Sequence, residues 1–460
     1  MANPIDPQAL GRESISKLIR RLALPAILAQ VINLLYNIVD RIFIARIPEV
    51  GAIALSGVGI VMPIILIISA FSCISSYGGA PLASMKLGAG RDAEAEAYVR
   101  ANAGLMLLIG TLLTAAILFF MDPLLILFAA RPTNISYARD YLSIYAIGNI
   151  FVLLTLALNS FISAQGAAKV AMRTILIGAI CNIVLDPIFI FTFQLGVRGA
   201  ALATILSQFI SFISVLAFLS STRSRLRLRG LSLNPRLIAK SIALGASGFT
   251  MMATESAVVL VYNQLLAKQG GDMHVATMVV LQSVMQILFI PMAGYMAGVQ
   301  PLLSYNFGAQ KMERVREIMR KAMIFYCSYS VSLVLLVLLF PGLFASIFTN
   351  DPELHALVVR YLPIFLAGAM IFGFQDTAQM FFVGTGRALQ SIFLASLRKI
   401  ILLIPFAFIL SSYFPVIGVY AAESCADFLS ASCAGILFTR AYRRLPKVTL
   451  IDEVHGCVSK

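Results

Sequence analysis

Long apolar runs constrain this chain more than any other feature of its sequence. A helix needs about 20 mostly apolar residues to cross the hydrocarbon core of a bilayer, and twelve such runs occur here. The 460 residues are 60% hydrophobic and only 12% charged, which excludes a soluble domain and a disordered chain. The sequence therefore predicts an all-α integral membrane protein with spans near 18–44, 52–80, 97–120, 137–163, 170–191, 198–219, 240–267, 275–303, 317–340, 357–384, 393–412 and 415–437.

Basic residues are distributed unequally between the two sides of the predicted membrane. Of 35 Lys and Arg residues, 28 lie near the termini or the loops after even-numbered spans. Positively charged loops are retained in the cytoplasm, so we expect a multi-pass protein of the cell (inner) membrane with both termini cytoplasmic. Four arginines of the middle connection are expected to anchor this topology or to bind lipid: Arg223, Arg225, Arg227 and Arg229.

Several classes of function lack support in the sequence. The six cysteines are scattered singly, without metal or redox spacing. No P-loop, serine hydrolase elbow or paired histidine motif occurs. The net charge of +14 has no soluble domain on which to present a basic face. We therefore expect no enzymatic activity, no cofactor and no nucleic-acid partner, and we expect a monomer in the lipid bilayer.

An internal repeat divides the chain into two halves. Residues 81–89 read PLASMKLGA, and residues 301–309 read PLLSYNFGA, an offset of 220. Six spans in each repeat give both halves the same orientation, so a pseudo-two-fold axis is expected along the membrane normal. The predicted organisation is an N-lobe (1–225), a basic cytoplasmic linker (226–239), a C-lobe (240–440) and a cytoplasmic tail (441–460).

Carboxylates inside the predicted spans require an explanation, because an ionised group in the bilayer costs several kcal/mol unless it faces protein, water or a cation. In the first half, Asn182 and Asp186 are four residues apart and share one helix face, which Asp40 of span 1 can approach. Such a cluster can hold a hard cation or share a proton. The structural alternative is that Asp40 pairs with Arg41 and that the other two residues bridge helices.

The second half is built differently, because no acid stands 220 residues from Asp186 or Asp376. Glu255 and Asp376 have no basic partner on their own helices, which favours a functional role for them over a structural one. Gln282 and Gln286 are cavity candidates, beside an adaptable apolar wall of methionines: Met278, Met285, Met292 and Met296, with Phe289.

Two further acids allow a structural and a functional interpretation. Glu423 and Asp427 lie four residues apart on span 12. They either neutralise Arg398 and Lys399 of span 11 in a buried ion pair or take part in transport.

The chain resembles the MATE (multidrug and toxic compound extrusion) family, in its bacterial branch. The resemblance covers residues 15–440 and rests on the two halves, the segment NIVDRIFIA at 37–45, the repeated PLxSxxxGA and GAALAT at 199–204. It implies a V-shaped pair of six-helix lobes that exports amphipathic, often cationic compounds in exchange for Na+ or H+. Arg41, and Ala45 where glycine is frequent, depart from the commonest family pattern.

The same resemblance implies which residues form the sites. An N-lobe cation or proton site is implied, with Na+ as the metal it can hold, at Asp40, Asn159, Asn182, Asp186 and Thr204. The C-lobe cavity acids of related transporters match Glu255 and Asp376.

Two other functions compete with drug export. A lipid-linked precursor flippase would share the two halves, but its cavity should be lined by Arg and Lys, whereas most charges inside these spans are acidic. A channel would need no alternation between states, and the duplicated, acid-bearing halves argue against it.

Overall fold

The computed structural model describes residues 9–128 and 130–446, and all regular secondary structure in these residues is helical. Twelve helical stretches are long and apolar enough to span a membrane, and each overlaps one predicted span. Most of them run a few residues further than predicted, because the helix continues into polar sequence at the membrane surface. The predicted fold class is confirmed.

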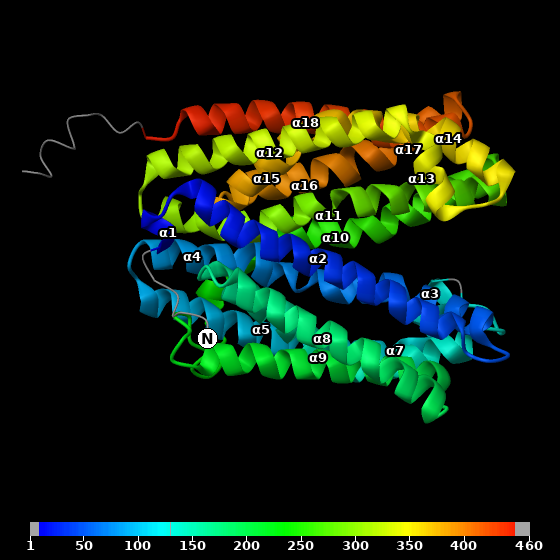
Figure 1. Ribbon diagram of the computed structural model, residues 1–460, viewed down its shortest axis with the longest axis horizontal. Coiled ribbons are helices and arrows are strands. Elements are labelled where there is room, and N and C mark those ends of the chain that lie inside the picture. Colours follow the sequence, from blue (N-terminus) through cyan, green and yellow to red (C-terminus); the bar gives the residue numbers. More distant parts are fainter. Residues whose placement is uncertain (1–8, 129, 447–460) are drawn as a thin grey trace, which may run out of the picture.

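The first half contains six of these spans (Figure 1). Two of these spans consist of more than one element, since a π-helical segment interrupts or ends them: α3–η1–α4 in one and α8–η2 in the other. The elements are α1 Ala9–Arg12, α2 Ile15–Ala45, α3 Gly51–Ala70, η1 Ile74–Gly79, α4 Ala80–Gly88, α5 Asp92–Phe119, α6 Met121–Leu127, α7 Ile135–Ala164, α8 Ala168–Pro187, η2 Ile188–Thr192 and α9 Gly196–Ser220.

The second half repeats this order with small differences. Its elements are α10 Pro235–Gln269, α11 Asp272–Gly308, α12 Met312–Leu339, α13 Pro341–Phe348, α14 Pro352–Leu366, η3 Ala367–Ile371, α15 Phe372–Gly384, α16 Ala388–Ser396, η4 Leu397–Leu403, α17 Ile404–Tyr413 and α18 Ile417–Arg443.

The helix starts confirm the internal repeat at an offset of 220 residues. Helices α5 and α12 begin at Asp92 and Met312, and helices α8 and α16 begin at Ala168 and Ala388. The short helices α6 and α13, which the apolar runs did not predict because they are too short to span a membrane, also begin 220 residues apart.

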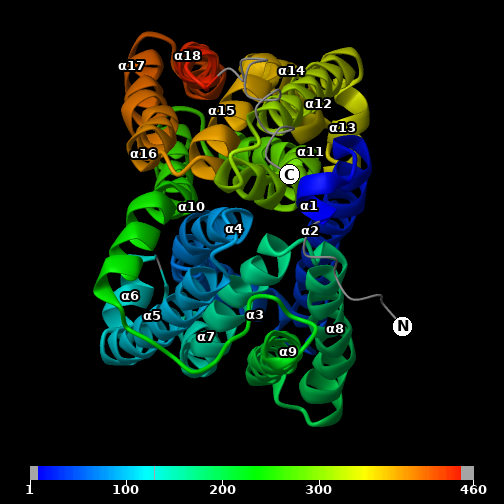
Figure 2. The same ribbon diagram turned by 90° about the vertical axis from the view of Figure 1, so that its left-hand side faces the viewer.

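The two halves form two lobes, and each lobe has one helix that packs against the other lobe (Figures 1 and 2). Helix α2 of the first half packs along α11 of the second, and α10 of the second half packs against η1 of the first. This reciprocal exchange is what a pseudo-two-fold axis between the lobes requires.

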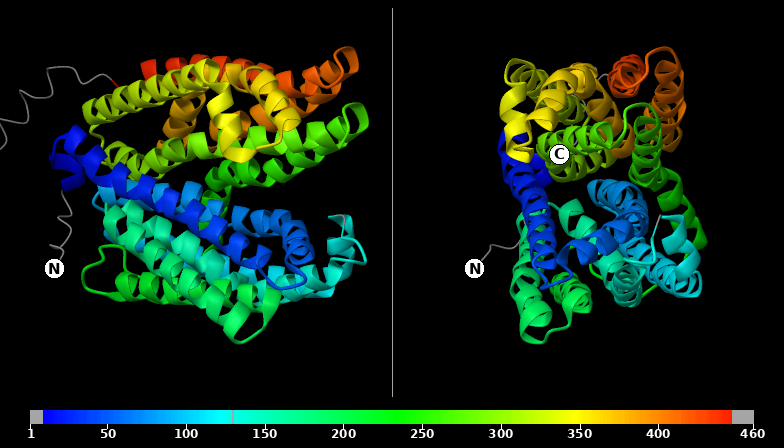
Figure 3. Two further views of the ribbon diagram at one scale, coloured as in Figure 1. Left: turned by 45° about the vertical axis from the view of Figure 1, so that its right-hand side comes forward. Right: turned by 90° about the vertical axis from the view of Figure 1, so that its right-hand side faces the viewer.

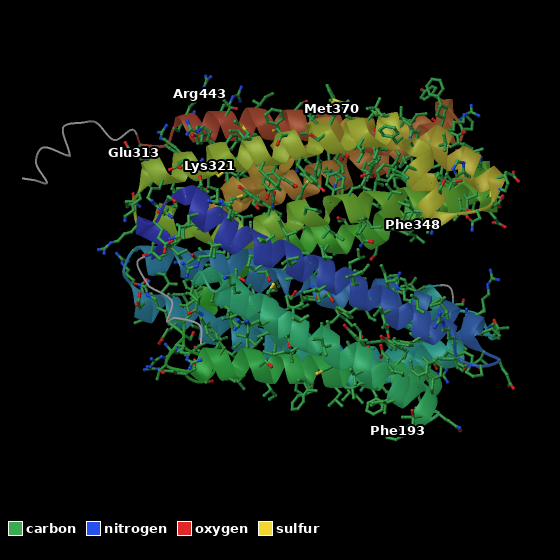
Figure 4. The ribbon with its side chains drawn as sticks, in the orientation of Figure 1. Phe193, Glu313, Lys321, Phe348, Met370 and Arg443 are labelled. Atoms are coloured by element: carbon green, nitrogen blue, oxygen red, sulfur yellow. The ribbon has the colours of Figure 1, made fainter. Side chains whose placement is uncertain are left out.

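The lobes converge at one end of the molecule and diverge toward the other (Figure 3). Helix α1 and the end of α18 lie at the end where they converge, which we call the terminal end. Figure 4 shows Glu313, Lys321 and Arg443 at the terminal end, and Phe193 and Phe348 at the opposite end, which we call the far end.

The repeated motif forms the contact between the lobes at the terminal end. Gly88 lies so close to the carbonyl oxygen of Tyr305 that a Cβ would collide with it, and Gly308 stands in the same relation to the carbonyl oxygen of Met85. The Ser84 hydroxyl donates to the Pro301 carbonyl across the interface at 2.9 Å. Small residues allow membrane helices to approach closely, so the motif gives both halves a surface for the same contact.

The short helix α1 belongs to the first half of the chain but is held by the second. The Asn306 amide and the Arg314 guanidinium donate to the Leu10 carbonyl at 3.0 and 3.2 Å. Arg314 also donates to the Glu13 carbonyl, and Lys311 to the Gly11 carbonyl, both at 2.8 Å. The open carbonyls of the helix end are thus satisfied by donors from the other lobe.

The connection between α9 and α10 covers residues 221–234 and runs along the first lobe. Arg225 binds Asp92 through two hydrogen bonds of 2.9 and 2.7 Å, and the backbone N–H of Arg225 donates to Gln165 at 2.7 Å. Helix α10 starts at Pro235, where the Asn234 side chain caps it. At least part of the arginine run therefore fixes the connection to the lobe.

The expected tail begins inside a helix. Helix α18 continues to Arg443, and residues 447–460 of the tail, with Cys457, lie outside the described residues. The other five cysteines, all within the described part of the chain, are free thiols.

We predict that Gly308→Ala destabilises the protein by about 1–3 kcal/mol, because the added methyl group overpacks a contact with backbone that cannot rotate away. Thermal unfolding of the purified protein in detergent measures this. Gly59→Ala is the matched control, since a Cβ at Gly59 meets no atom within 4 Å. Equal unfolding temperatures for both variants would contradict the close contact.

Candidate functional site

The six carboxylates that the sequence singled out form one group in each lobe. Asp40 on α2 and Asp186 on α8 belong to the first lobe. The second lobe contributes four: Glu255 on α10, Asp376 on α15, and Glu423 and Asp427 on α18. Each buried carboxylate needs a compensating group, and the two lobes provide compensation in different ways.

The first group, which we call the N-lobe cluster, consists of Asp40, Asn182 and Asp186. Helices α2 and α8 pack along each other, which brings Asp40 close enough to Asp186 for their charges to interact. The Asn182 amide donates to the Asp186 carboxylate at 3.2 Å. The structure thus brings together three of the five residues implied for the N-lobe site.

One oxygen of each residue in the N-lobe cluster is buried and accepts no hydrogen bond within the described part of the chain. These atoms are Oδ1 of Asp40, Oδ1 of Asn182 and Oδ2 of Asp186. A buried acceptor without a partner costs about 1–3 kcal/mol. Three such oxygens in one cluster form a set that a hard cation can coordinate, or that a proton on one carboxylate can partly satisfy.

Arg41 does not neutralise Asp40 by direct contact. Its side chain is exposed, and the ion pairs formed by the described residues do not include it. Consecutive residues of an α-helix do not face each other, so Arg41 acts on Asp40 only through space. The N-lobe cluster therefore holds two carboxyl groups and no basic side chain.

Two tyrosines that the sequence did not predict for this site interact with Asp40. Tyr36, one helical turn before Asp40 on α2, interacts with it electrostatically. Tyr141 of α7 is 2% exposed and interacts with both Asp40 and Thr204. The four-residue spacing could have identified Tyr36, whereas no sequence signal connects Tyr141 with Asp40.

Asn159, the fifth residue implied for the site, is engaged by α8. Its amide donates to the Ala171 carbonyl at 3.3 Å, and its carbonyl accepts from the Thr174 hydroxyl at 3.2 Å. In this conformation both polar groups of Asn159 have protein partners, unlike the oxygens of the N-lobe cluster.

We predict that Asp40→Asn and Asp186→Asn each abolish the gradient-driven export that the family resemblance implies, while leaving the protein folded. An amide keeps most of the shape and hydrogen bonding of a carboxylate but cannot carry the charge that binds a cation or proton. Export of a fluorescent cationic dye from reconstituted vesicles measures the effect, with the unfolding temperature as the control. Wild-type export rates in both variants would remove the N-lobe cluster from the coupling mechanism.

In the second lobe, Arg398 is the centre of an ion-pair network. It donates to Asp427 at 2.6 Å and to Glu423 at 3.0 Å, and it lies over the Phe372 ring at 4.5 Å. The Tyr262 hydroxyl donates to the other oxygen of Glu423 at 2.5 Å. Arg398 thus makes the ion pairs that the structural interpretation of Glu423 and Asp427 requires.

Lys399 pairs with a different acid from the one expected. Its ammonium donates to Glu255 at 2.5 Å, rather than forming an ion pair with Glu423 or Asp427. Arg398 and Lys399 both lie in the π-helical segment η4. The wider turn there changes how consecutive side chains are directed, and each of these two cations meets a carboxylate on a different neighbouring helix.

Asp376 is partly buried on α15 and interacts electrostatically with Arg398 and Asp427. Asp376 also interacts electrostatically with Tyr77 of η1 in the first lobe and with Tyr326 of α12. Asp376 is therefore close to the boundary between the lobes.

The residues proposed for an adaptable cavity wall on α11 are divided between the packed core and more open positions. Met278 and Met292 are each 1% exposed and Met296 is 7% exposed, which corrects the expectation that these three line a cavity. Phe289 packs edge-to-face against Phe372 at 5.3 Å. Gln282 is partly buried, and Gln286 is exposed.

Within the described residues, no three His, Cys, Asp or Glu side chains converge as a metal site would require. Any cation at the N-lobe cluster would therefore be held by two carboxylates together with amide or hydroxyl oxygens. This donor set suits Na+ better than a transition metal.

A family model described as MatE matches residues 25–188 and 248–409, one segment in each lobe. The chain belongs to the MatE family of transporters. The resemblance seen in the sequence is thereby confirmed, and the duplicated match follows the internal repeat.

Relatives and solved structures agree with this assignment. The multidrug export protein MepA of Staphylococcus haemolyticus (strain JCSC1435) is 26% identical over 446 residues, which cover 95% of this chain and 97% of the relative. MepA of Staphylococcus aureus (strain MSSA476) is 25% identical, with 93% and 94% covered.

Solved MATE structures share the fold of this transporter. A crystal structure of a MATE protein in a bent conformation superposes with a TM-score of 0.89 at 22% identity, covering 96% of this chain and 98% of that one. An outward-facing MATE transporter of the MOP superfamily gives 0.87 at 21% identity, with 97% and 99% covered.

Proposed function

We propose that this transporter is a secondary active antiporter that exports amphipathic, cationic compounds in exchange for Na+ or H+ by alternating access. The observation that carries the proposal is the N-lobe cluster. Two buried carboxyl groups lie together without a basic partner, and three of the cluster's oxygens accept no hydrogen bond in the described chain. A group of this kind gains most when it binds a cation or a proton.

Coupling follows if the N-lobe cluster binds the ion in one state and releases it in the other. Two close carboxylates repel each other, so an entering cation or proton relieves that repulsion and brings α2 and α8 together. Helix α2 packs against α11 of the other lobe. A change at Asp40 can therefore be transmitted to the lobe interface through one rigid helix.

Cationic substrates are favoured by the charges of the second lobe. The carboxylate group of the second lobe contains four acids and two cations, Arg398 and Lys399, and the relatives named above are multidrug export proteins. A lipid flippase needs free basic groups for its anionic headgroup, but both of these cations are bound by acids. Organic cations fit the lobe better than an anionic lipid.

The orientation of the protein completes the proposal. We place the terminal end in the cytoplasm, as the positive loops predict, with the division into lobes near residue 225 and the protein as a monomer. The contacts at Gly88, Gly308 and α1 then close the cytoplasmic side. The lobes diverge toward the outer side (Figure 3), and the opposite state requires these contacts to separate.

We predict that Glu255→Gln and Asp376→Asn weaken export of cationic substrates more than export of neutral ones. A carboxylate in a low-dielectric site attracts a cation, and its loss removes about 1–3 kcal/mol that a neutral compound never used. Vesicle export of a charged and a neutral fluorescent compound measures the difference. Equal loss for both would indicate ion coupling or structural damage at these positions instead.

The identity of the coupling ion can be tested by removing the uncharged oxygens of Thr204 and Asn182. If Na+ couples transport, Thr204→Val and Asn182→Leu should raise the Na+ concentration for half-maximal export, because Na+ needs several oxygens in one shell. If protons couple transport, the same variants should mainly shift the pH optimum. We expect the Na+ result; full export without Na+, together with unchanged behaviour of Thr204→Val, would establish proton coupling.

A further inference from the structure

The two cations of η4 are held in very different ways. Arg398 binds two carboxylates and lies against an aromatic ring, which fixes its guanidinium. Lys399 has a single ion-pair partner among the described residues, Glu255. A lysine ammonium on a four-carbon stem is also easier to move than a guanidinium bound at two points.

Glu255 differs in its exposure from the two acids that pair with Arg398. Its side chain is 40% exposed, whereas those of Glu423 and Asp427 are 2% exposed. Lys399 itself is 6% exposed. The carboxylate is therefore accessible from outside the pair, and the ammonium approaches it from within the lobe.

The position of Glu255 along α10 places it beside the boundary between the lobes. Phe249 packs on Phe71 at 4.9 Å, and Met252 contacts Cys73 at 3.9 Å, so this stretch of α10 lies against the first lobe. Glu255 follows Met252 by three residues in the direction of the far end. Along α10, Glu255 thus follows these lobe contacts, and the lobes diverge toward the far end (Figure 3).

We propose that Lys399 is a tethered cation that occupies Glu255 until an organic cation takes its place. The proposal rests on the proposed function and deepens it by assigning Lys399 as a specificity-determining residue. Without substrate, the Lys399 ammonium compensates the charge of the Glu255 carboxylate. An unpaired carboxylate in a low-dielectric site would destabilise the protein. A cationic compound can replace one positive charge by another, whereas a neutral compound cannot compensate Glu255 once Lys399 has left.

Removing the tethered cation should tighten binding of charged compounds only. In Lys399→Met, tetraphenylphosphonium should bind the purified full-length protein about tenfold more tightly at alkaline pH, where Glu255 stays ionised, because its competitor is gone. The charged groups that act on Glu255 are Lys399 and Arg398. Neutral triphenylphosphine oxide should bind both proteins equally, and Lys399→Arg should stay near the wild type.

Lys321→Met is the matched control. Lys321 also pairs with a glutamate, Glu317, at 2.6 Å in the same lobe, but at the terminal end. This variant should leave both affinities unchanged. Unchanged or weaker tetraphenylphosphonium binding in Lys399→Met, with a normal unfolding temperature, would overturn the proposal.

A second readout uses the wild-type lysine and does not depend on any variant folding. Saturating tetraphenylphosphonium should increase the reaction of Lys399 with an amine-specific reagent, measured by mass spectrometry of the peptide, because its ammonium is released from Glu255. Unchanged or reduced labelling would refute the exchange. Export of tetraphenylphosphonium from wild-type vesicles under an ion gradient tests the proposed function separately. If these vesicles export the compound but the labelling of Lys399 does not rise, only the role of Lys399 is wrong.

Discussion

The cost of an ionised carboxylate in a low-dielectric interior determines how this transporter is built. In the second lobe, three acids form ion pairs with the basic side chains of Arg398 and Lys399. Among the described residues, Asp40 and Asp186 of the first lobe take part in no ion pair. The same physical requirement thus separates acids that stabilise the fold or meet the substrate from acids that must take up an ion from solution.

Close backbone contact is the second constraint, and it connects the two charge centres. The glycines of the repeated motif allow the backbones of α4 and α11 to approach closely at the terminal end. Helices α2 and α10 each pack against the opposite lobe. Asp40 lies on α2 and Glu255 on α10. Both charge centres therefore include one helix that crosses the lobe boundary, so movement of either helix changes both the interface and a site.

The sequence predicted the twelve spans because each apolar run is long enough to decide the matter alone. It also predicted the approach of Asn182 to Asp186, since a spacing of four residues fixes a shared helix face. Contacts between different helices were harder. The pairing of Lys399 with Glu255 depends on the π-helical turn of η4, and the place of Tyr141 beside Asp40 depends on how α7 packs; neither follows from local spacing.

The central claim is that the N-lobe cluster, and not the second lobe, binds the coupling ion. Infrared difference spectroscopy of the purified protein tests it most directly, by recording the carbonyl band of protonated carboxyl groups before and after Na+ is added at constant pH. We expect a signal in the wild type that disappears in the Asp40→Asn/Asp186→Asn double variant and persists in Glu255→Gln and Asp376→Asn. A signal that survives the double variant and disappears with Asp376 would contradict it.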